Sequence, residues 1–405
     1  MALKQTADEL IPELKGYQQP LLIAGVAGLA VSALGWFIEP TQFYQSYLMG
    51  YMLWLGVTLG CFALGMVHQL SGGAWGVVIR RPIGAAARTL PLMTLLFIPI
   101  VLGMGHLYSW THADIVARDE ILQAKHGYLN VPFFLVRAAI YFAAWNTISY
   151  FLNAWSLEQD RTADPRIAVR MQRLSAGGLV VYGLTITFAS FDWLMSLDPH
   201  WYSTIYGALV LAGQALSGMA FLIIVLVWLS NRSPLDRIVV KAHFHDLGNL
   251  MLAFVMLWAY FAFSQYLIIW AGNLPNEILW YASRLQSGWR SIGAALVVFH
   301  FAVPFVFLLS RTVKREGRLI VRLAIAILLA RLLDLFWLIA PEFHTSGIVV
   351  SWLDILLPLS IGALWLGWFV AQLRGRAILP VHDPQFDEAL GRIIQRGGER
   401  PSTAH

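Results

Sequence analysis

The stretch STIYGALVLAGQALSGMAFLIIVLVWL, residues 203–229, decides the fold of this chain. It contains no Asp, Glu, Lys or Arg. A helix needs about 20 apolar residues to cross the roughly 30 Å of hydrocarbon in a bilayer. This stretch is longer than that, so it predicts a transmembrane helix.

The remainder of the 405-residue chain repeats this pattern. Charged residues make up only 13% of it, against roughly 25% in a soluble domain. We predict an all-α polytopic membrane protein with a tail at each end, residues 1–19 and 374–405. Its ten transmembrane helices are predicted at residues 20–37, 43–70, 84–108, 129–156, 173–196, 203–229, 244–272, 288–311, 318–340 and 350–373.

Basic residues alternate along the segments that connect these helices. The two tails and every second loop together hold 20 Lys and Arg. The loops of the opposite side hold four, namely Arg118, Lys125, Arg284 and Arg290. Lys and Arg near membrane spans stay in the cytoplasm. The sequence therefore predicts that both termini are cytoplasmic, which requires an even number of helices.

Cys61 is the only cysteine of the chain, and this excludes Cys-ligated iron–sulfur clusters and C-x-x-C-H haem attachment within it. No two predicted helices each offer two histidines at a common spacing, as a membrane cytochrome b would. P-loop, dinucleotide-binding and zinc motifs are missing from the sequence as well. We expect no metal, no covalently bound cofactor and no nucleic-acid partner.

An internal repeat relates two parts of the chain. Asp192 lies in Phe-Asp-Trp and has Pro199 seven residues later, and Asp334 lies in Asp-Leu-Phe-Trp and has Pro341 seven residues later. The segment from Trp110 through Glu-Ile-Leu to Arg137 has a similar counterpart at residues 270–290. Both matches are four helices apart. We predict two four-helix bundles, residues 43–196 and 203–340, flanked by the first and tenth helices.

Ionisable side chains lie inside several predicted spans, where they are costly and usually face a partner or a cavity. Arg331 and Asp334 share one helix face, as a structural pair or as part of a proton path. We expect Arg137 to pair with a carboxylate such as Asp192. His300 is either a hydrogen-bonded core residue or a ligand. The candidates for a proton path are Asp192, Asp198, His200, Arg137, His245, Asp246, His300, Arg331 and Asp334.

Two of these groups lie near helix ends. Asp192, with Asp198 and His200 in the next loop, either relays protons or satisfies backbone groups at the end of its helix. His245 and Asp246 open the predicted seventh helix at the cytoplasmic face. They form either a proton inlet or an ordinary favourable contact with the helix dipole.

Two motifs resemble a known family. The segment FDWLMSLDPHWYST, residues 191–204, resembles a signature of NrfD/PsrC-like membrane subunits. The segments WAYFAFSQYL, residues 258–267, and WAGNLPNE, residues 270–277, are similar to the smaller of two such subunits in bacterial alternative complex III.

This resemblance implies a ten-helix subunit of a quinol:electron-acceptor oxidoreductase of the cytochrome c type in the bacterial cytoplasmic membrane. It implies a multihaem cytochrome c subunit, an iron–sulfur subunit and a sister membrane subunit as partners, which would hold the haem and the clusters. Asp192 and His200 match motif positions. A proton-conducting role and a possible quinone or menaquinol site follow from the family, but no quinone ligand set can be matched residue by residue.

Two other functions fit the same features. A secondary transporter also combines internal repeats with buried charges, and it commonly has helices broken by Gly or Pro at matching places in the repeats. Pro91 and Pro99 lie in the third predicted span, whereas the seventh has no proline. In a purely structural anchor, the buried ionisable residues would only form internal salt bridges.

Overall fold

The computed structural model describes residues 13–232, 235–286, 288–374, 376, 377, 379 and 380. Most of both predicted tails lies outside these residues. Within them, ten helical spans are long and apolar enough to cross a membrane. They are α2 (Leu14–Ile38), α3 (Pro40–Ser71), α5 to α7 (Arg80–Leu102), α11 (Val131–Thr162), α12 (Pro165–Trp193, with a short 3-10 turn η3, Met195–Leu197), α13 (Tyr206–Ser230), α15 (Lys241–Gly272), α17 to α18 (Trp289–Leu309), α20 (Gly317–Ile339, with η5, Ala340–Glu342) and α21 (Leu353–Leu373).

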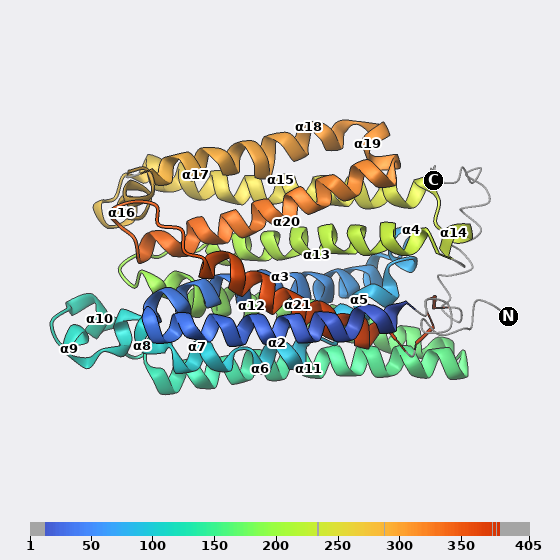
Figure 1. The fold of residues 1–405 in the computed structure, drawn as a ribbon, viewed down its shortest axis with the longest axis horizontal. Helices are drawn as coiled ribbons and strands as arrows, with labels where there is room; N and C mark the ends of the chain where they lie inside the picture. Colours follow the sequence, from blue (N-terminus) through green and yellow to red (C-terminus); the bar gives the residue numbers. More distant parts are fainter. Residues whose placement is uncertain (1–12, 233–234, 287, 375, 378, 381–405) are drawn as a thin grey trace.

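Short helices occupy the two ends of this bundle (Figure 1). One end carries α8, α9, α10 and α16, and we call it the α10/α16 end. The other end carries α4, α14 and α19, and α2 begins there, so we call it the α14/α19 end. These helices are α4 (Ala74–Val77), α8 (Met104–Leu107), η2 (Ser109–Thr111), α9 (Ala113–Val116), α10 (Glu120–Lys125), α14 (Leu235–Ile238), α16 (Pro275–Arg284) and α19 (Arg311–Arg315).

Helices α3 and α13 form the centre of the molecule. In each of them 83% of the most apolar window is buried, against 17% in α2 and 22% in α15. The two helices approach closely at Gly60 and Gly218, where a Cβ atom on Gly60 would lie 1.9 Å from the carbonyl oxygen of Gln214. Small residues of this kind allow membrane helices to pack backbone to backbone.

Outer helices carry large apolar side chains on their exposed faces. On α15, Tyr260, Phe263, Ile268 and Trp270 are each more than 60% exposed. An exposed apolar surface of this extent suits contact with lipid rather than water. Together with the ten spans, it agrees with the predicted polytopic membrane fold.

The third span is not the continuous helix predicted for residues 84–108. It is divided into α5 (Arg80–Ala87), α6 (Leu90–Leu95) and α7 (Ile98–Leu102). Pro91 and Pro99 have no amide hydrogen, so each leaves the carbonyl four residues earlier without its helical donor. Ser149 of α11 donates to the freed carbonyl of Ala87 at 3.0 Å. Tyr47 of α3 donates to the nearby carbonyl of Leu96 at 2.7 Å.

The eighth span also departs from a regular α-helix. It consists of α17 (Trp289–Leu296), the π-helical segment η4 (Val297–Ala302) and α18 (Val303–Leu309). Pro304 cannot donate to the carbonyl of His300, and this local loss favours a change in helical pitch. Such π segments often occur at functional sites.

The predicted groups of four helices are each in contact, but they are not separate bodies. In the first group α12 packs on α3 and α11, and in the second group α13 packs on α15 and α20. However, α13 also packs on α3 and α12. Helices α2 and α21 pack on each other and on α3. The division into two bundles therefore stays a prediction.

Candidate functional site

A buried ion pair joins α11 to α12 near the α10/α16 end. Asn130 caps the start of α11 by accepting from the amide of Phe133 at 2.9 Å, and Arg137 follows about two turns later. Arg137 donates through Nε to Oδ2 of Asp192 at 2.9 Å and through Nη2 to Oδ1 at 2.8 Å. The Asp192 side chain is fully buried. The predicted pairing of Arg137 with Asp192 is thus confirmed.

Tyr141 completes the surroundings of this carboxylate. It lies one turn along α11 from Arg137, and its hydroxyl donates to Oδ2 of Asp192 at 2.9 Å. The third nitrogen of Arg137, Nη1, donates to the carbonyl of Tyr128 at 2.9 Å. Charge-assisted bonds in a bidentate pair are about twice as strong as neutral ones. Asp192 therefore has a fixed position and a phenol with which it can exchange a proton.

Polar side chains continue from Tyr141 along the same helix. Ser149 and Asn153 follow it at multiples of four residues, and both are buried. Asn153 donates to the carbonyl of Ser149 at 2.8 Å. From Asn153 to Tyr141 the helix rises about 18 Å. Sequence reasoning missed Tyr141, Ser149 and Asn153, although their four-residue spacing within one span was a detectable signal.

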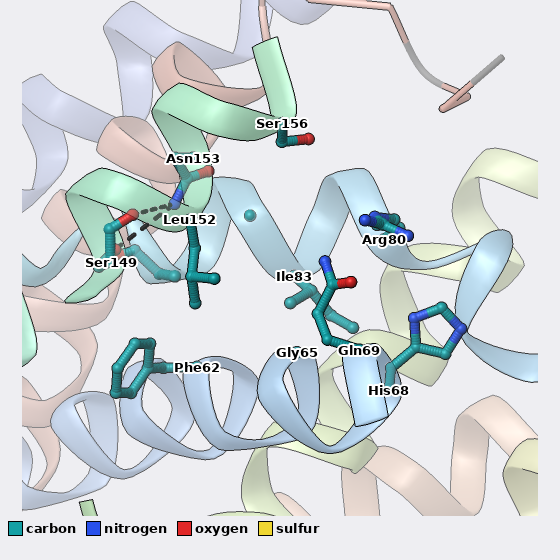
Figure 2. Close-up of a pocket in the computed structure, with 12 residues that line it drawn as sticks. Phe62, Gly65, His68, Gln69, Arg80, Ile83, Ser149, Leu152, Asn153 and Ser156 are labelled. Atoms are coloured by element: carbon teal, nitrogen blue, oxygen red, sulfur yellow. Dashed lines mark hydrogen bonds between the residues drawn. The ribbon is translucent and has the colours of Figure 1, made fainter. Parts of the chain in front are cut away.

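This polar face leads to a cavity near the α14/α19 end. The cavity has a volume of about 60 Å³, which is room for more than one water molecule. Figure 2 shows Ser149 and Asn153 of α11 on one side of it, with Gln69, His68 and Arg80 on the other. Its other lining residues are Phe62, Gly65, Ile83, Gly84, Ala87, Leu152 and Ser156.

Aromatic side chains separate the cavity from Asp192. Trp145 lies on the same face of α11 between Tyr141 and Ser149, and its ring contacts that of Trp193, with centroids 6.0 Å apart. Phe142 stacks on Trp193 at 5.6 Å. Trp145 and Trp193 are both fully buried. Movement of these rings would be needed for water to connect the two polar regions.

The second buried carboxylate, Asp334, lies on α20. Arg331 contacts it through Nη1 from one turn earlier on the same helix, and Trp258 of α15 donates to its Oδ2 at 3.2 Å. Both charged side chains are nearly fully buried. The Arg331 guanidinium packs against Gly213 of α13, where a Cβ atom would lie 2.4 Å from its Cζ. Glycine at this position therefore makes room for the charge.

His300 lies beside this pair, in the π segment of the eighth span. Its ring centroid is 4.0 Å from that of Trp258. The side chain is fully buried, and neither ring nitrogen has a hydrogen-bond partner among the described residues. The two alternatives for His300, a hydrogen-bonded core residue or a ligand, therefore both stay predictions. A buried imidazole without partners leaves a donor and an acceptor available at the centre of the second half.

Asp198 and His200 lie outside the spans, at the α10/α16 end. His200 Nε2 is 2.5 Å from Oδ2 of Asp119, which caps α10, and its Nδ1 is 3.8 Å from Asp198. The hydrogen bond from His200 is the largest cause that lowers the pKa of Asp119. Lys125 donates to the carbonyl of Pro199 at 2.5 Å. These contacts attach the loop of α9 and α10 to the segment after α12.

A further ion pair at this end was not predicted. Arg284 of α16 lies 2.6 Å from Glu342 and donates to the carbonyl of Leu338 at 3.0 Å. Its guanidinium also lies 3.5 Å from the Trp280 ring centre. Burial lowers the pKa of Arg284, although the Glu342 carboxylate opposes this shift. The pair could not be predicted from the sequence, because Glu342 and Arg284 both lie outside the predicted spans, in connecting segments.

His245 and Asp246 are distant from these clusters, on α15 near the α14/α19 end. Their Nδ1 and Oδ1 atoms are 3.6 Å apart, and both side chains are partly exposed. Asn249 bridges from His245, at 3.3 Å, to Lys314 of α19, at 2.6 Å. Helix α15 begins at Lys241, so these residues lie in its second turn rather than at its opening.

Asp354 anchors another polar cluster, between α3 and α21. Ser46 donates to its Oδ1 at 2.6 Å and Gln42 does so at 3.1 Å. His344 Nε2 lies 3.0 Å from the amide oxygen of Gln42. These contacts fasten the start of α21 to the start of α3. They also satisfy a carboxylate that is only 5% exposed.

A groove on the side of the bundle lies against α11, one of the two helices that carry the Arg137–Asp192 pair. It measures about 450 Å³ and is lined by α6, α7 and α11. Its polar side chains, Thr94 and Asn146, hydrogen-bond to each other at 3.0 Å. A quinone headgroup needs a hydrogen-bond donor for each of its two carbonyl oxygens. The donors of Thr94 and Asn146 are already used, on the Leu90 carbonyl, on Thr94 and on the Phe142 carbonyl. We therefore assign no quinone ligand to this groove.

No group of three or more His, Cys, Asp and Glu in the described part of the chain could hold a metal ion. The nine candidates do not form one site. The structure joins Arg137 to Asp192, Asp198 to His200, His245 to Asp246, and Arg331 to Asp334 with His300 close by. Comparison with protein-family models and with curated proteins gives no match.

Proposed function

We propose that this chain is the proton-conducting membrane subunit of a quinol:electron-acceptor oxidoreductase of the alternative complex III type. Its place would be the bacterial cytoplasmic membrane, with the α14/α19 end in the cytoplasm, as the positive-inside rule favours. A multihaem cytochrome c subunit, an iron–sulfur subunit and a sister NrfD-like subunit would carry the electron chemistry. The motifs at residues 191–204 and 258–277 support this assignment.

One observation carries the proton-conducting role. A fully buried carboxylate, Asp192, contacts the phenol of Tyr141, and on the same helix, beyond Trp145, the buried polar side chains of Ser149 and Asn153 line a cavity. Ser149 and Asn153 also have structural partners, the Ala87 carbonyl and Arg88, but neither contact requires them to lie on the helix that holds Arg137 and Tyr141. This placement is explained if protons move along the helix between the cavity and Asp192.

Each residue has a defined part in this path. Arg137 holds the Asp192 carboxylate in place through two hydrogen bonds, and Tyr141 is positioned to pass a proton to or from it. Ser149 and Asn153 orient water at the cavity, and Trp145 with Trp193 blocks a continuous water column. Asp198 and His200 receive protons at the opposite surface, where the His200 ring lies between the carboxylates of Asp119 and Asp198. We assign no redox step to this chain.

The test is Asp192→Asn in the assembled complex, with Asp114→Asn as the matched control. Asp114 is an exposed carboxylate of α9 at the same end. We expect Asp192→Asn to lower turnover and proton release at least about tenfold. This is a conservative limit, because a positioned proton-transfer group contributes about 100-fold or more. The control should retain both. Unchanged turnover and unchanged proton release in Asp192→Asn would remove this residue from the path.

The structure provides little support for a transporter. The third span is broken at two prolines, but its counterpart in the repeat, α15, is one continuous helix from Lys241 to Gly272. Transporters of the repeat type usually break corresponding helices in both halves. A structural anchor predicts a different result, because neutral replacement of both Arg137 and Asp192, the ion pair of the proposed path, would then leave the activity of the complex intact.

A further inference from the structure

Three arginines from two distant segments gather at the α14/α19 end. Arg81 and Arg88 belong to α5 and the turn after it, and Arg376 follows α21. Arg81 lies 2.5 Å from Asp160 at the end of α11. Arg376 interacts electrostatically with both other arginines. The cluster therefore brings together the third span, the end of the fourth span and the segment after the tenth.

Positive charge exceeds negative charge in this cluster. Arg88 has only neutral partners: its Nη1 donates to Asn153 at 2.7 Å and its Nε to Gln372 at 3.1 Å. The charges that act on it, those of Arg81 and Arg376, are both positive. Burial, and then repulsion from Arg81, lower the pKa of Arg376 to about 10. Within the part of the chain that the structure describes, the carboxylate that acts on this cluster is that of Asp160, which contacts Arg81 and attracts Arg376.

The polar cavity of Figure 2 adjoins these arginines. Two of its lining residues are their hydrogen-bond partners, since Arg88 donates to Asn153 and Arg81 donates to Ser156 at 3.1 Å. Gly84 forms part of the wall, and a Cβ atom there would lie 3.5 Å from Nη1 of Arg88. Arg81 and Arg88 are therefore connected, through Ser156 and Asn153, to a hollow lined by both polar and apolar side chains.

We infer that this arginine cluster binds the phosphate group of an anionic phospholipid. Guanidinium groups match phosphate oxygens through paired hydrogen bonds. The cluster lies at the ends of α5, α11 and α21, the level at which lipid headgroups surround a membrane protein. A phosphodiester would neutralise part of the excess charge, and its acyl chains would lie on the neighbouring spans. The inference does not rest on the proposed function.

The test uses the purified full chain, stripped of lipid in neutral detergent. Thermal unfolding is measured after addition of phosphatidylglycerol, of phosphatidylcholine, or of inorganic phosphate at equal concentration. Bound lipid is counted by native mass spectrometry. The variant carries Arg88→Gln and Arg376→Gln. Its matched control carries Arg166→Gln and Arg170→Gln, which remove the same charge from exposed positions of α12 at the same end.

We expect phosphatidylglycerol to raise the melting temperature of the unaltered chain and of the control, with little effect from phosphatidylcholine or inorganic phosphate. The double variant should bind phosphatidylglycerol about 10- to 100-fold more weakly, because two charge-assisted contacts are lost. Arg376→Gln alone, which lies outside the spans, provides the same comparison if the double variant does not fold. Equal affinity in variant and control would overturn the proposal. If inorganic phosphate raised the melting temperature as much as phosphatidylglycerol does, the ligand would be free phosphate and the proposal of a lipid would be overturned.

Discussion

Asp192 and Asp334 occupy the same place in the two copies of the predicted repeat, but their positive partners come from different elements. Asp192 is held by Arg137 of the neighbouring helix through two hydrogen bonds. Asp334 is held by Arg331 of its own helix and by one longer bond from Trp258. The first carboxylate therefore ties two helices together, whereas the second is largely neutralised within one.

The surroundings of the two carboxylates differ as well. Behind Asp192, Tyr141, Ser149 and Asn153 continue the polar face of α11 to a cavity. Behind Trp258, the buried face of α15 carries Met251 and Val255. A repeat that preserves an acidic motif thus does not preserve the path around it. This contrast is why we place the proton path in the first half of the chain.

The largest expected effect tests the different origin of the two arginines. Arg137→Gln leaves a buried carboxylate without its cation and should destabilise the protein by about 3–5 kcal/mol. Arg331→Gln should cost less, because it removes one hydrogen bond to its carboxylate whereas Arg137→Gln removes two. Thermal or denaturant unfolding of the purified chain measures both variants.

The control for this pair is the combined Arg137→Gln and Asp192→Asn variant. Removing both charges leaves no isolated ion, so part of the lost stability should return. Equal destabilisation by Arg137→Gln and Arg331→Gln would contradict the contrast drawn here.

A smaller effect is expected at the start of the polar line. Tyr141→Phe keeps the ring and removes the hydroxyl that donates to Asp192. The loss of a hydrogen bond to a charged group should cost about 1.5–3 kcal/mol. Tyr260→Phe, on the exposed face of α15, is the matched control and should leave the free energy of unfolding unchanged. If both variants are neutral, the phenol does not hold the carboxylate.

The smallest expected effect is a pH dependence at the α10/α16 end. The hydrogen bond from His200 lowers the pKa of Asp119 in the folded chain. A lowered carboxyl pKa contributes stability above its unfolded value of about 3.9, and this contribution is lost as the pH falls through the folded value. Residues 113–130 should therefore exchange amide hydrogens faster below about pH 4.

The second half provides the internal comparison for this measurement. Its corresponding helix, α16, is held by Arg284 and Glu342, and Arg284 is only 1% exposed. We expect α16 to keep its protection over the pH range in which the first loop loosens. Asp119→Asn should abolish the difference in pH response, and its persistence in that variant would exclude this contact as the cause.

Much of the fold could be predicted from the sequence, because a bilayer sorts residues by simple rules. Long apolar stretches predicted all ten spans, and the expected depth of Arg137 predicted a carboxylate partner. The breaks in the third and eighth spans were not predicted, although Pro91, Pro99 and Pro304 were visible. Proline removes a donor, but only the structure shows that Ser149 donates to the carbonyl freed by Pro91 and that Tyr47 donates to the carbonyl of Leu96 near Pro99.

The sequence by itself determined what must avoid water: ten apolar helices, and within them a few charged groups that need partners. Only the tertiary structure decided which partner each group has. Hydropathy depends on the composition of a segment alone, whereas an ion pair depends on distances of about 3 Å between side chains. That is why the same Asp motif could be found twice in the sequence, while its cross-helix pairing with Arg137 and its within-helix pairing with Arg331 became distinct only in the packed chain.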